Sequence, residues 1–249
     1  MYYARNARSA RSATIAFLLL GFAVTRVWSF TLEPMTANLS TFGEKSVATF
    51  RIHPPILRPA VRFRVVSRDL SVEGTEPNAT VDSVFAVYPS SAIVEPGRCA
   101  SVNIQWRGTA KPEREQCFRF IAEQVPVTAD QGAGSGLKIL FRYIASVYVS
   151  DGTLSPALSV ETSTSLDSAG NPGILLAISN TGTQHVIAKD LSVDLAFGGG
   201  ASYQIRTAEL GAFGNFNYLP GCAIRVFIPA REKLPGGPCT GRLNYDSEQ

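Results

Sequence analysis

The sequence has few of the residues that enzymes use for acid–base and nucleophilic chemistry. Only two histidines occur, His53 and His185. His53 precedes a Pro-Pro pair at the end of an expected strand and His185 follows a turn, so both are expected at the surface or at a sheet edge. No GxSxG, HExxH or phosphate-loop motif is present, and the glycines of residues 198–200 lack the helix and lysine of a phosphate cradle. The sequence therefore predicts a protein that is not an enzyme and has no catalytic residue, metal site or cofactor.

Long apolar runs are also scarce, and the one that stands out lies near the N-terminus. Residues 13–24 (ATIAFLLLGFAV) are apolar, but a membrane-spanning helix needs ~20 such residues. The basic residues before this run are Arg5, Arg8 and Arg11, and the small residues after it are Val27 and Ser29. This order predicts a cleaved signal peptide over residues 1–29 and export to the periplasm, the alternative being an uncleaved membrane anchor. After cleavage no membrane span is expected.

Positive charge is largely confined to the predicted signal peptide. The whole chain has a formal net charge of +3, and the first 29 residues hold four arginines and no acidic residue. Removing these four charges leaves a mature chain at −1. Nucleic-acid-binding proteins present a strongly basic face, so a nucleic-acid partner is not expected.

Cysteine is sparse, with four residues and no CxxC pair. Export favours disulfides, and the spacing does not match a zinc site. Cys222 and Cys239 flank one expected hairpin and are the preferred pair. Cys99 and Cys117 each begin one of two successive strands, which start at opposite ends of a sheet, so a bridge between them would be out of reach. Either of these two is alternatively a buried, unpaired thiol.

Period-two alternation of Val, Ile, Phe and Tyr is abundant, and no amphipathic helix is evident after residue 29. Strands are expected in the first half at residues 46–53, 60–67, 101–106 and 118–126, and in the second half at residues 157–164, 173–179, 185–197, 202–210, 222–229 and 240–245. Residues 150–155 (SDGTLS) are expected to link two domains. The pattern predicts an all-β protein with two immunoglobulin-like β-sandwiches, at residues 30–150 and 151–249.

One expected strand, residues 137–149 (LKILFRYIASVYV), is much longer than the usual ~5–6 residues and carries apolar side chains on both faces. Before it lies a loop of small and polar residues, 129–136. At a sheet edge such a strand would invite pairing with another chain, a liability that most proteins avoid unless they use it. The alternative is that it is simply the long central strand of the first domain.

Several blocks of the sequence resemble periplasmic pilus (fimbrial) assembly chaperones. They are residues 87–102 (VYPSSAIVEPGRCASV), 114–127 (REQCFRFIAEQVPV), 129–149, 178–185 (ISNTGTQH) and 218–223 (YLPGCA). They occur in the family's order along nearly the whole mature chain. The resemblance implies two immunoglobulin-like domains arranged as a boomerang.

The resemblance also implies a mechanism. A chaperone of this family lends its long edge strand to a pilin subunit whose own fold lacks one strand, and it delivers the subunit to an outer-membrane usher. By position, the lent side chains would be Leu137, Ile139, Phe141 and Tyr143. The implied partners are therefore pilin subunits and an usher.

In the best-studied branch of this family, an arginine and a lysine anchor the subunit's C-terminal carboxylate, and this sequence departs from that pattern. The arginine position of that branch is occupied by Thr36 in this sequence, and the lysine position by Ser146. The sequence is similar instead to the divergent, archaic branch, which often has an arginine nearer the middle of the long strand. Arg142 is then the candidate anchor, or else a solvated edge charge; Arg62 and Arg64 are weaker candidates.

The sequence thus predicts a periplasmic chaperone that caps pilin-like subunits by donor-strand complementation. The alternative function is a secreted structural or adhesive protein, either a pilin-like subunit or a surface immunoglobulin-like module. A pilin would need an incomplete domain and a donor segment at its own N-terminus, whereas the segment after the cleavage site resembles an ordinary first strand.

Overall fold

The computed structural model describes residues 30–53, 58–68, 84–108, 111–126, 139–152, 154–230 and 233–248. The predicted signal peptide (residues 1–29), the loop at residues 129–136 and Leu137 lie outside the described residues. No helix in the described ranges is long and apolar enough to cross a membrane.

The first half of the chain forms a sandwich of two sheets. Its strands are β1 (Thr31–Glu33), β2 (Thr36–Leu39), β3 (Val47–His53), β4 (Ala60–Ser67), β5 (Phe85–Tyr88), β6 (Ser91–Ile93), β7 (Ala100–Trp106), β8 (Gln116–Val125) and β9 (Arg142–Val149), with a short 3₁₀ turn at Glu44–Ser46. One sheet has the order β1-β3-β7-β5 and the other β2-β9-β8-β4-β6.

The core of this sandwich is formed by the inward-facing side chains of strands in which apolar and polar residues alternate. On β7, Val102, Ile104 and Trp106 are buried while the residues between them are exposed, because successive side chains point to opposite faces. Phe50 from one sheet stacks on Phe120 from the other, with ring centroids 4.1 Å apart. Stacked aromatic pairs of this kind join the two sheets across the core.

The second half forms another sandwich. Its elements are β10 (Leu158–Leu166), β11 (Pro172–Asn180), β12 (Val186–Phe197), β13 (Ser202–Ile205), α2 (Thr207–Leu210), a 3₁₀ turn at Gly211–Gly214, β14 (Phe216–Tyr218), β15 (Ala223–Pro229) and β16 (Cys239–Glu248). One sheet has the order β10-β11-β15. In the other, β12 is flanked by β13 and β14 on one side and by β16 on the other.

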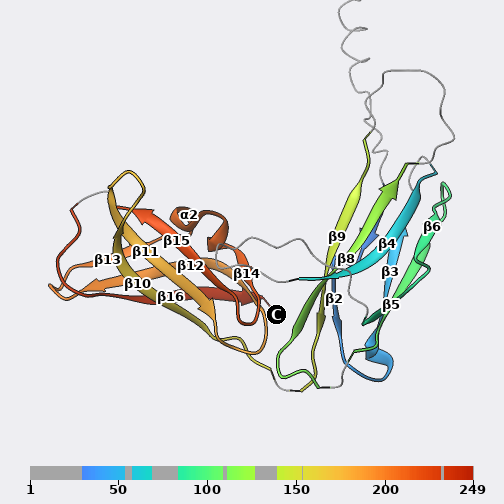
Figure 1. The fold of residues 1–249 in the computed structure, drawn as a ribbon, viewed down its shortest axis with the longest axis horizontal. Helices are drawn as coiled ribbons and strands as arrows, with labels where there is room; N and C mark the ends of the chain where they lie inside the picture. The colour runs from blue at the N-terminus through green and yellow to red at the C-terminus, as the bar shows by residue number, and fades with distance from the viewer. Residues whose placement is uncertain are drawn as a thin grey trace, which may run out of the picture.

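The two sandwiches lie at an angle to each other, as the arms of a boomerang (Figure 1). The predicted fold class, all-β with two immunoglobulin-like sandwiches, is confirmed. One expected strand was partly wrong: of residues 202–210 only the first part is strand, and Thr207–Leu210 forms a helical turn. The Glu209 carboxylate accepts the backbone N–H of Arg206 at 2.9 Å and so caps the start of this turn.

The expected Cys222–Cys239 bridge is absent, and none of the four cysteines forms a disulfide. Cys222 lies beside the end of β11, where its carbonyl accepts the N–H of Asn180, whereas Cys239 pairs with Phe197 at the end of β12. On β10, Thr162 donates to the Cys239 carbonyl, whereas Leu158, four residues away, pairs with Asn180 beside Cys222, so the two cysteines are separated by about 13 Å along the strand direction. Disulfides need Cα atoms within about 7 Å.

His185 lies between the two domains, which corrects the surface position expected for it. Its ring stacks on Tyr148 of β9 with centroids 3.8 Å apart. Its backbone N–H and its Nδ1 both donate to the Glu115 carboxylate, at 2.8 and 2.5 Å. The Glu115 side chain is only 3% exposed. Asn217 of the second domain adds a hydrogen bond to the Tyr148 hydroxyl at 2.5 Å. Polar and aromatic contacts therefore fix the two domains to each other.

Replacing His185 with alanine should lower the free energy of unfolding by about 3 kcal/mol, because the buried Glu115 carboxylate loses its side-chain partner. Urea unfolding followed by intrinsic fluorescence measures the change. His53→Ala is the matched control: the His53 side chain is 39% exposed in its pair with Glu33, so its loss should cost less than about 1 kcal/mol. Equal effects of the two substitutions would contradict a stabilising interdomain contact.

Candidate functional site

Strand β9 is paired along its whole length on one side but only at its base on the other. Its eight residues pair antiparallel with β8, from Arg142 opposite Glu123 to Val149 opposite Gln116. On the other side, β2 pairs in parallel with Ser146–Val149 only. Within the described part of the chain, no strand pairs with this side of β9 above Ser146, and we call this stretch, Arg142 to Ala145, the open edge.

The backbone of the open edge presents hydrogen-bonding groups. The carbonyl of Phe141 accepts the N–H of Gln124 on the β8 side, and the N–H of Ser146 donates to the Met35 carbonyl on the β2 side. Bonding direction alternates along an antiparallel pair, so Arg142 and Ile144 direct their N–H and C=O groups away from β8. Among the described residues, no strand pairs with these groups.

The four side chains predicted to be lent to a subunit differ in their surroundings. Ile139 is 60% exposed. Phe141 and Tyr143 are half-buried and pack against the core of the first sandwich, where Tyr143 contacts the Phe30 ring at a centroid distance of 4.9 Å. Leu137 lies outside the described residues. The structure therefore places Ile139 as the most exposed of the three that it describes.

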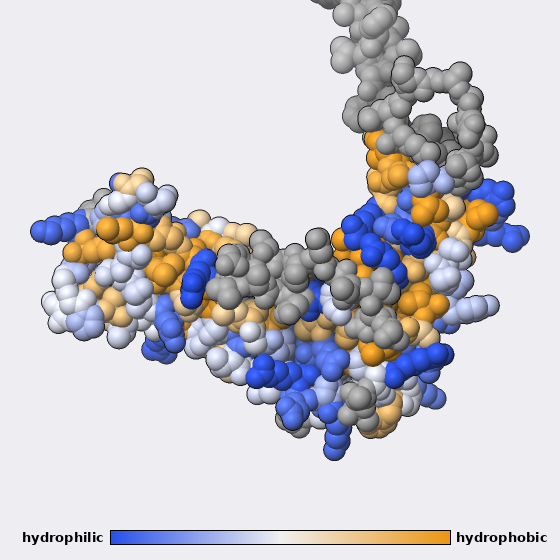
Figure 2. Space-filling view, in the orientation of Figure 1, coloured by the Kyte–Doolittle hydropathy of each residue, from blue (hydrophilic) through white to orange (hydrophobic). Residues whose placement is uncertain are grey.

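Two further apolar residues are exposed here, Leu140 (44%) and Ile144 (40%). Figure 2 shows hydrophobic surface at the upper end of β9. The sequence signal for both was the apolar character of the second face of the strand. The segment from Ile139 to Ile144, which leads into β9, thus carries apolar side chains on both faces, as a strand that adds to a partner's sheet requires.

The outward face of β4, β8 and β9 is rich in arginine. Arg62 on β4 and Arg142 on β9 are the cross-strand neighbours of Glu123 on β8. Arg62 Nε donates to Glu123 at 2.9 Å, and Arg64 Nε lies 3.6 Å from the same carboxylate oxygen. The candidate anchor Arg142 and the weaker candidates Arg62 and Arg64 therefore surround a single carboxylate.

Burial alone would raise the pKa of Glu123, but the hydrogen bond from Arg62 and the charges of Arg64, Arg62 and Arg142 outweigh it. The pKa of Glu123 is consequently held below its ordinary value of 4.5. The ionised carboxylate is the form that the folded protein favours. It neutralises part of the arginine charge on this face.

Because this pKa is lowered on folding, the stability it contributes is full above pH 4.5 and is lost as the pH falls through the folded-state value. Glu123→Gln should therefore destabilise the protein at neutral pH, by less than about 1 kcal/mol since the Arg62 side chain is 60% exposed. Urea unfolding of both proteins at neutral pH and at several values below 4.5 measures the difference, which should shrink towards the acid end. A difference that grows on acidification would contradict this.

The two positions where the best-studied branch has its basic anchor are adjacent in space. Thr36 and Ser146 are cross-strand partners in the β2–β9 pair. Half-buried Arg119 reaches this point from β8, where its Nη1 donates to the Ser146 hydroxyl at 3.1 Å. Sequence analysis did not single out Arg119, because its role depends on the β8–β9 register. The guanidinium of Arg119 thus lies at the base of the open edge, although β9 has no lysine at this position.

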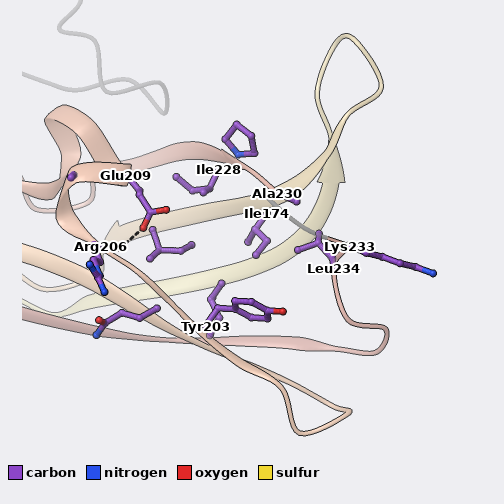
Figure 3. Close-up of a pocket in the computed structure, with 13 residues that line it drawn as sticks. Ile174, Tyr203, Arg206, Glu209, Ile228, Ala230, Lys233 and Leu234 are labelled. Atoms are coloured by element: carbon purple, nitrogen blue, oxygen red, sulfur yellow. Dashed lines mark hydrogen bonds between the residues drawn. The ribbon is translucent and has the colours of Figure 1, made fainter.

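The second domain contains a cavity of about 540 Å³, which shares no residue with β8 or β9. It lies between β13, α2 and β15, and Figure 3 shows Ile174, Ile228 and Tyr203 around it with the Arg206–Glu209 cap at one end. Among the described residues, no group of three or more His, Cys, Asp or Glu could hold a metal ion. The open edge of β9 is therefore the feature with the clearest chemical use.

No protein-family profile and no curated protein sequence matches this chain. Solved structures do. One chain of the complex of the chaperone CsuC with the tip subunit CsuE, from the archaic Csu pili of Acinetobacter baumannii, is 13% identical with a TM-score of 0.57, covering 88% of this chain and 97% of that one.

Two other fimbrial structures are similar over a comparable length. The class 5 fimbriae chaperone CfaA is 14% identical with a TM-score of 0.54, covering 86% of this chain and 98% of that one. A chain of the Salmonella enterica complex of the SafA pilin with the SafB chaperone is 15% identical with a TM-score of 0.52, covering 90% and 95%. These similarities establish a shared two-domain all-β fold.

Proposed function

We propose that this protein is a non-enzymatic periplasmic chaperone that captures pilin-like subunits by lending them strand β9. The observation that carries the proposal is the open edge of β9. Among the described residues no strand pairs with the outward backbone groups of Arg142 and Ile144, and the Ile139, Leu140 and Ile144 side chains at and just before this edge are exposed. The similarity to chaperones of known structure, one of them from archaic pili, supports it. In this assignment residues 1–29 are the export signal, residues 30–150 the subunit-binding domain and residues 151–249 the second immunoglobulin-like domain.

Capture would proceed by strand addition. A subunit that lacks one strand exposes an apolar groove, and the N–H and C=O groups of Arg142 and Ile144 would pair with the edge of that groove. Ile139 would enter the groove, and Leu137, Phe141 and Tyr143 would complete the lent series. Burial of one such side chain contributes roughly 1.5–3 kcal/mol, so a few of them suffice for specific binding.

We further propose that the protein delivers the captured subunit to an outer-membrane usher. A lent strand that another segment can displace leaves the subunit ready for transfer to a growing fibre. The interdomain contact of Tyr148 with His185 fixes the second domain relative to β9, so the subunit would meet one defined surface of the chaperone. We assign the C-terminal carboxylate of the subunit to Arg142.

Ile139→Asp should weaken capture of the subunit at least about 10-fold, because the substitution puts a charge into the apolar groove. Ile139 is a sharper test than Phe141, since Phe141 also packs against the chaperone's own core. The tagged protein is purified from periplasm with its bound partner, which mass spectrometry identifies, and affinity is then measured with that partner.

Ile93→Asp is the matched control. Ile93 is 57% exposed and lies on β6, the strand at the other end of the same sheet, so its replacement should leave capture unchanged. Equal capture of the subunit by the wild type and by the Ile139→Asp variant would contradict the strand-donation mechanism. Absence of any partner, from cells shown to be making pilins, would favour a structural or adhesive protein.

Arg142→Ala should weaken binding of a subunit with a free C-terminus about 10-fold, since a charge-assisted bond to the carboxylate is lost. A subunit with an amidated C-terminus should bind the wild type and the variant alike. Arg51→Ala, on the other sheet, is the control and should change neither affinity. If the loss appears with Arg119→Ala instead, the anchor lies at the base of β9 and the assignment to Arg142 is wrong.

A further inference from the structure

A second cluster of reactive side chains lies on the other sheet of the first sandwich. Cys99 immediately precedes β7, His53 ends β3 and Glu33 ends β1. Cys99 is exposed, and the His53 and Glu33 side chains are 39% and 69% exposed. The three residues belong to three neighbouring segments of one sheet, and all are accessible to small molecules in solution.

Strand register brings these residues together. Ile52 pairs with Ala100 across β3 and β7, so the next residues outward on the two segments, His53 and Cys99, lie side by side. On the other side, His53 pairs with Thr31 of β1, and Glu33 is the diagonal neighbour on the same face. The arrangement is therefore set by the backbone of three strands.

The contacts form a line with the histidine in the middle. The Cys99 sulfur lies 3.9 Å from Nδ1 of His53, and Nε2 of His53 lies 2.9 Å from the Glu33 carboxylate. An Nε2–H that donates to Glu33 leaves Nδ1 as the proton acceptor facing the thiol. Because His53 uses opposite nitrogens for its two neighbours, the three groups do not converge on one point, which excludes a shared metal ion.

We propose that Cys99 is a thiol–disulfide exchange site that His53 activates and Glu33 orients, with a low-molecular-weight disulfide as its substrate. The thiolate is the attacking species in such exchange, and an ordinary thiol is only a few per cent ionised at pH 7. An imidazole nitrogen in contact with the sulfur can accept the thiol proton as the sulfur attacks, in the way a general base activates a nucleophile. This activity is independent of subunit capture, since β9 lies in the other sheet of the sandwich.

The exchange step balances without a further reactant. The Cys99 proton moves to Nδ1 of His53, and the thiolate sulfur attacks one sulfur of the small disulfide. A new S–S bond forms as the old one breaks, and the displaced thiolate takes the proton from His53. Cys99 is thereby oxidised to a mixed disulfide, and the small disulfide, which is the oxidant, releases one half as the reduced thiol.

Two permanently charged arginines lie next to this cluster. Arg51 of β3 is the cross-strand partner of Glu33, and Arg98 directly precedes Cys99; both are exposed. The positive charges of these two exposed arginines attract anionic disulfides to this end of the sheet. Glutathione disulfide, which carries carboxylates, is therefore a suitable probe.

The test is to incubate the purified protein with glutathione disulfide, and separately with 5,5′-dithiobis(2-nitrobenzoate). Intact mass gives the rate of modification and peptide mapping gives its site. Cys99 should react before Cys117, Cys222 and Cys239. His53→Ala should slow its reaction about 10-fold at neutral pH, and the rates should converge at alkaline pH, where the thiol ionises unaided.

Glu33→Gln is the second variant, because it changes the residue that orients His53 and leaves both His53 and Cys99 in place. It should slow the reaction less than His53→Ala does, since a glutamine carbonyl still accepts the Nε2 proton. The proposal is overturned if the wild type and His53→Ala react equally fast at neutral pH, or if another cysteine reacts first. Subunit capture, measured on the same samples, should be unchanged by modification.

Discussion

The ladder between β8 and β9 is the interaction on which the candidate site depends. It holds all of β9 on one side, so the strand stays extended and in register where its other side is open. β8 is itself fixed from the core, since its Phe120 is stacked on Phe50 of the opposite sheet. The same ladder places Arg119 beside Ser146 and Glu123 beside Arg142. An edge that is already ordered loses little conformational entropy when another strand adds to it.

β9 also connects the two domains. Val147 and Val149 point into the core of the first sandwich, whereas Tyr148 between them packs with the core cluster of the second. One strand thus carries opposite faces into two hydrophobic cores at its base and apolar side chains into solvent at its upper end. The stack of Tyr148 on His185 and the buried Glu115 carboxylate are the polar part of this junction. The angle between the arms is therefore set at the foot of the same strand that forms the candidate binding edge.

Sequence analysis predicted the features that depend on local periodicity. Alternation identified the sandwich strands, and the apolar character of both faces of residues 137–149 marked the exposed Ile139, Leu140 and Ile144. It could not predict contacts that depend on which strands become neighbours. His185 was assigned to the surface because its partners, Tyr148 and Glu115, are distant in sequence. The predicted Cys222–Cys239 bridge was wrong, because two cysteines that flank one hairpin in the sequence need not lie close together in the sandwich. Arg119 was missed, because only the register of β8 with β9 brings it to Ser146.

The short parallel pairing of β2 with β9 limits the length over which another strand can pair with β9. β2 begins at Thr36, opposite Ser146, and occupies every edge position of β9 below that point. A strand that adds from above cannot slide past this position, because the backbone groups it would need are already bonded to β2. The start of β2 at Thr36 therefore limits how far along β9 an added strand can pair. Arg142 lies four residues before Ser146 on β9, so the carboxylate contact assigned to it falls within the stretch that an added strand can reach.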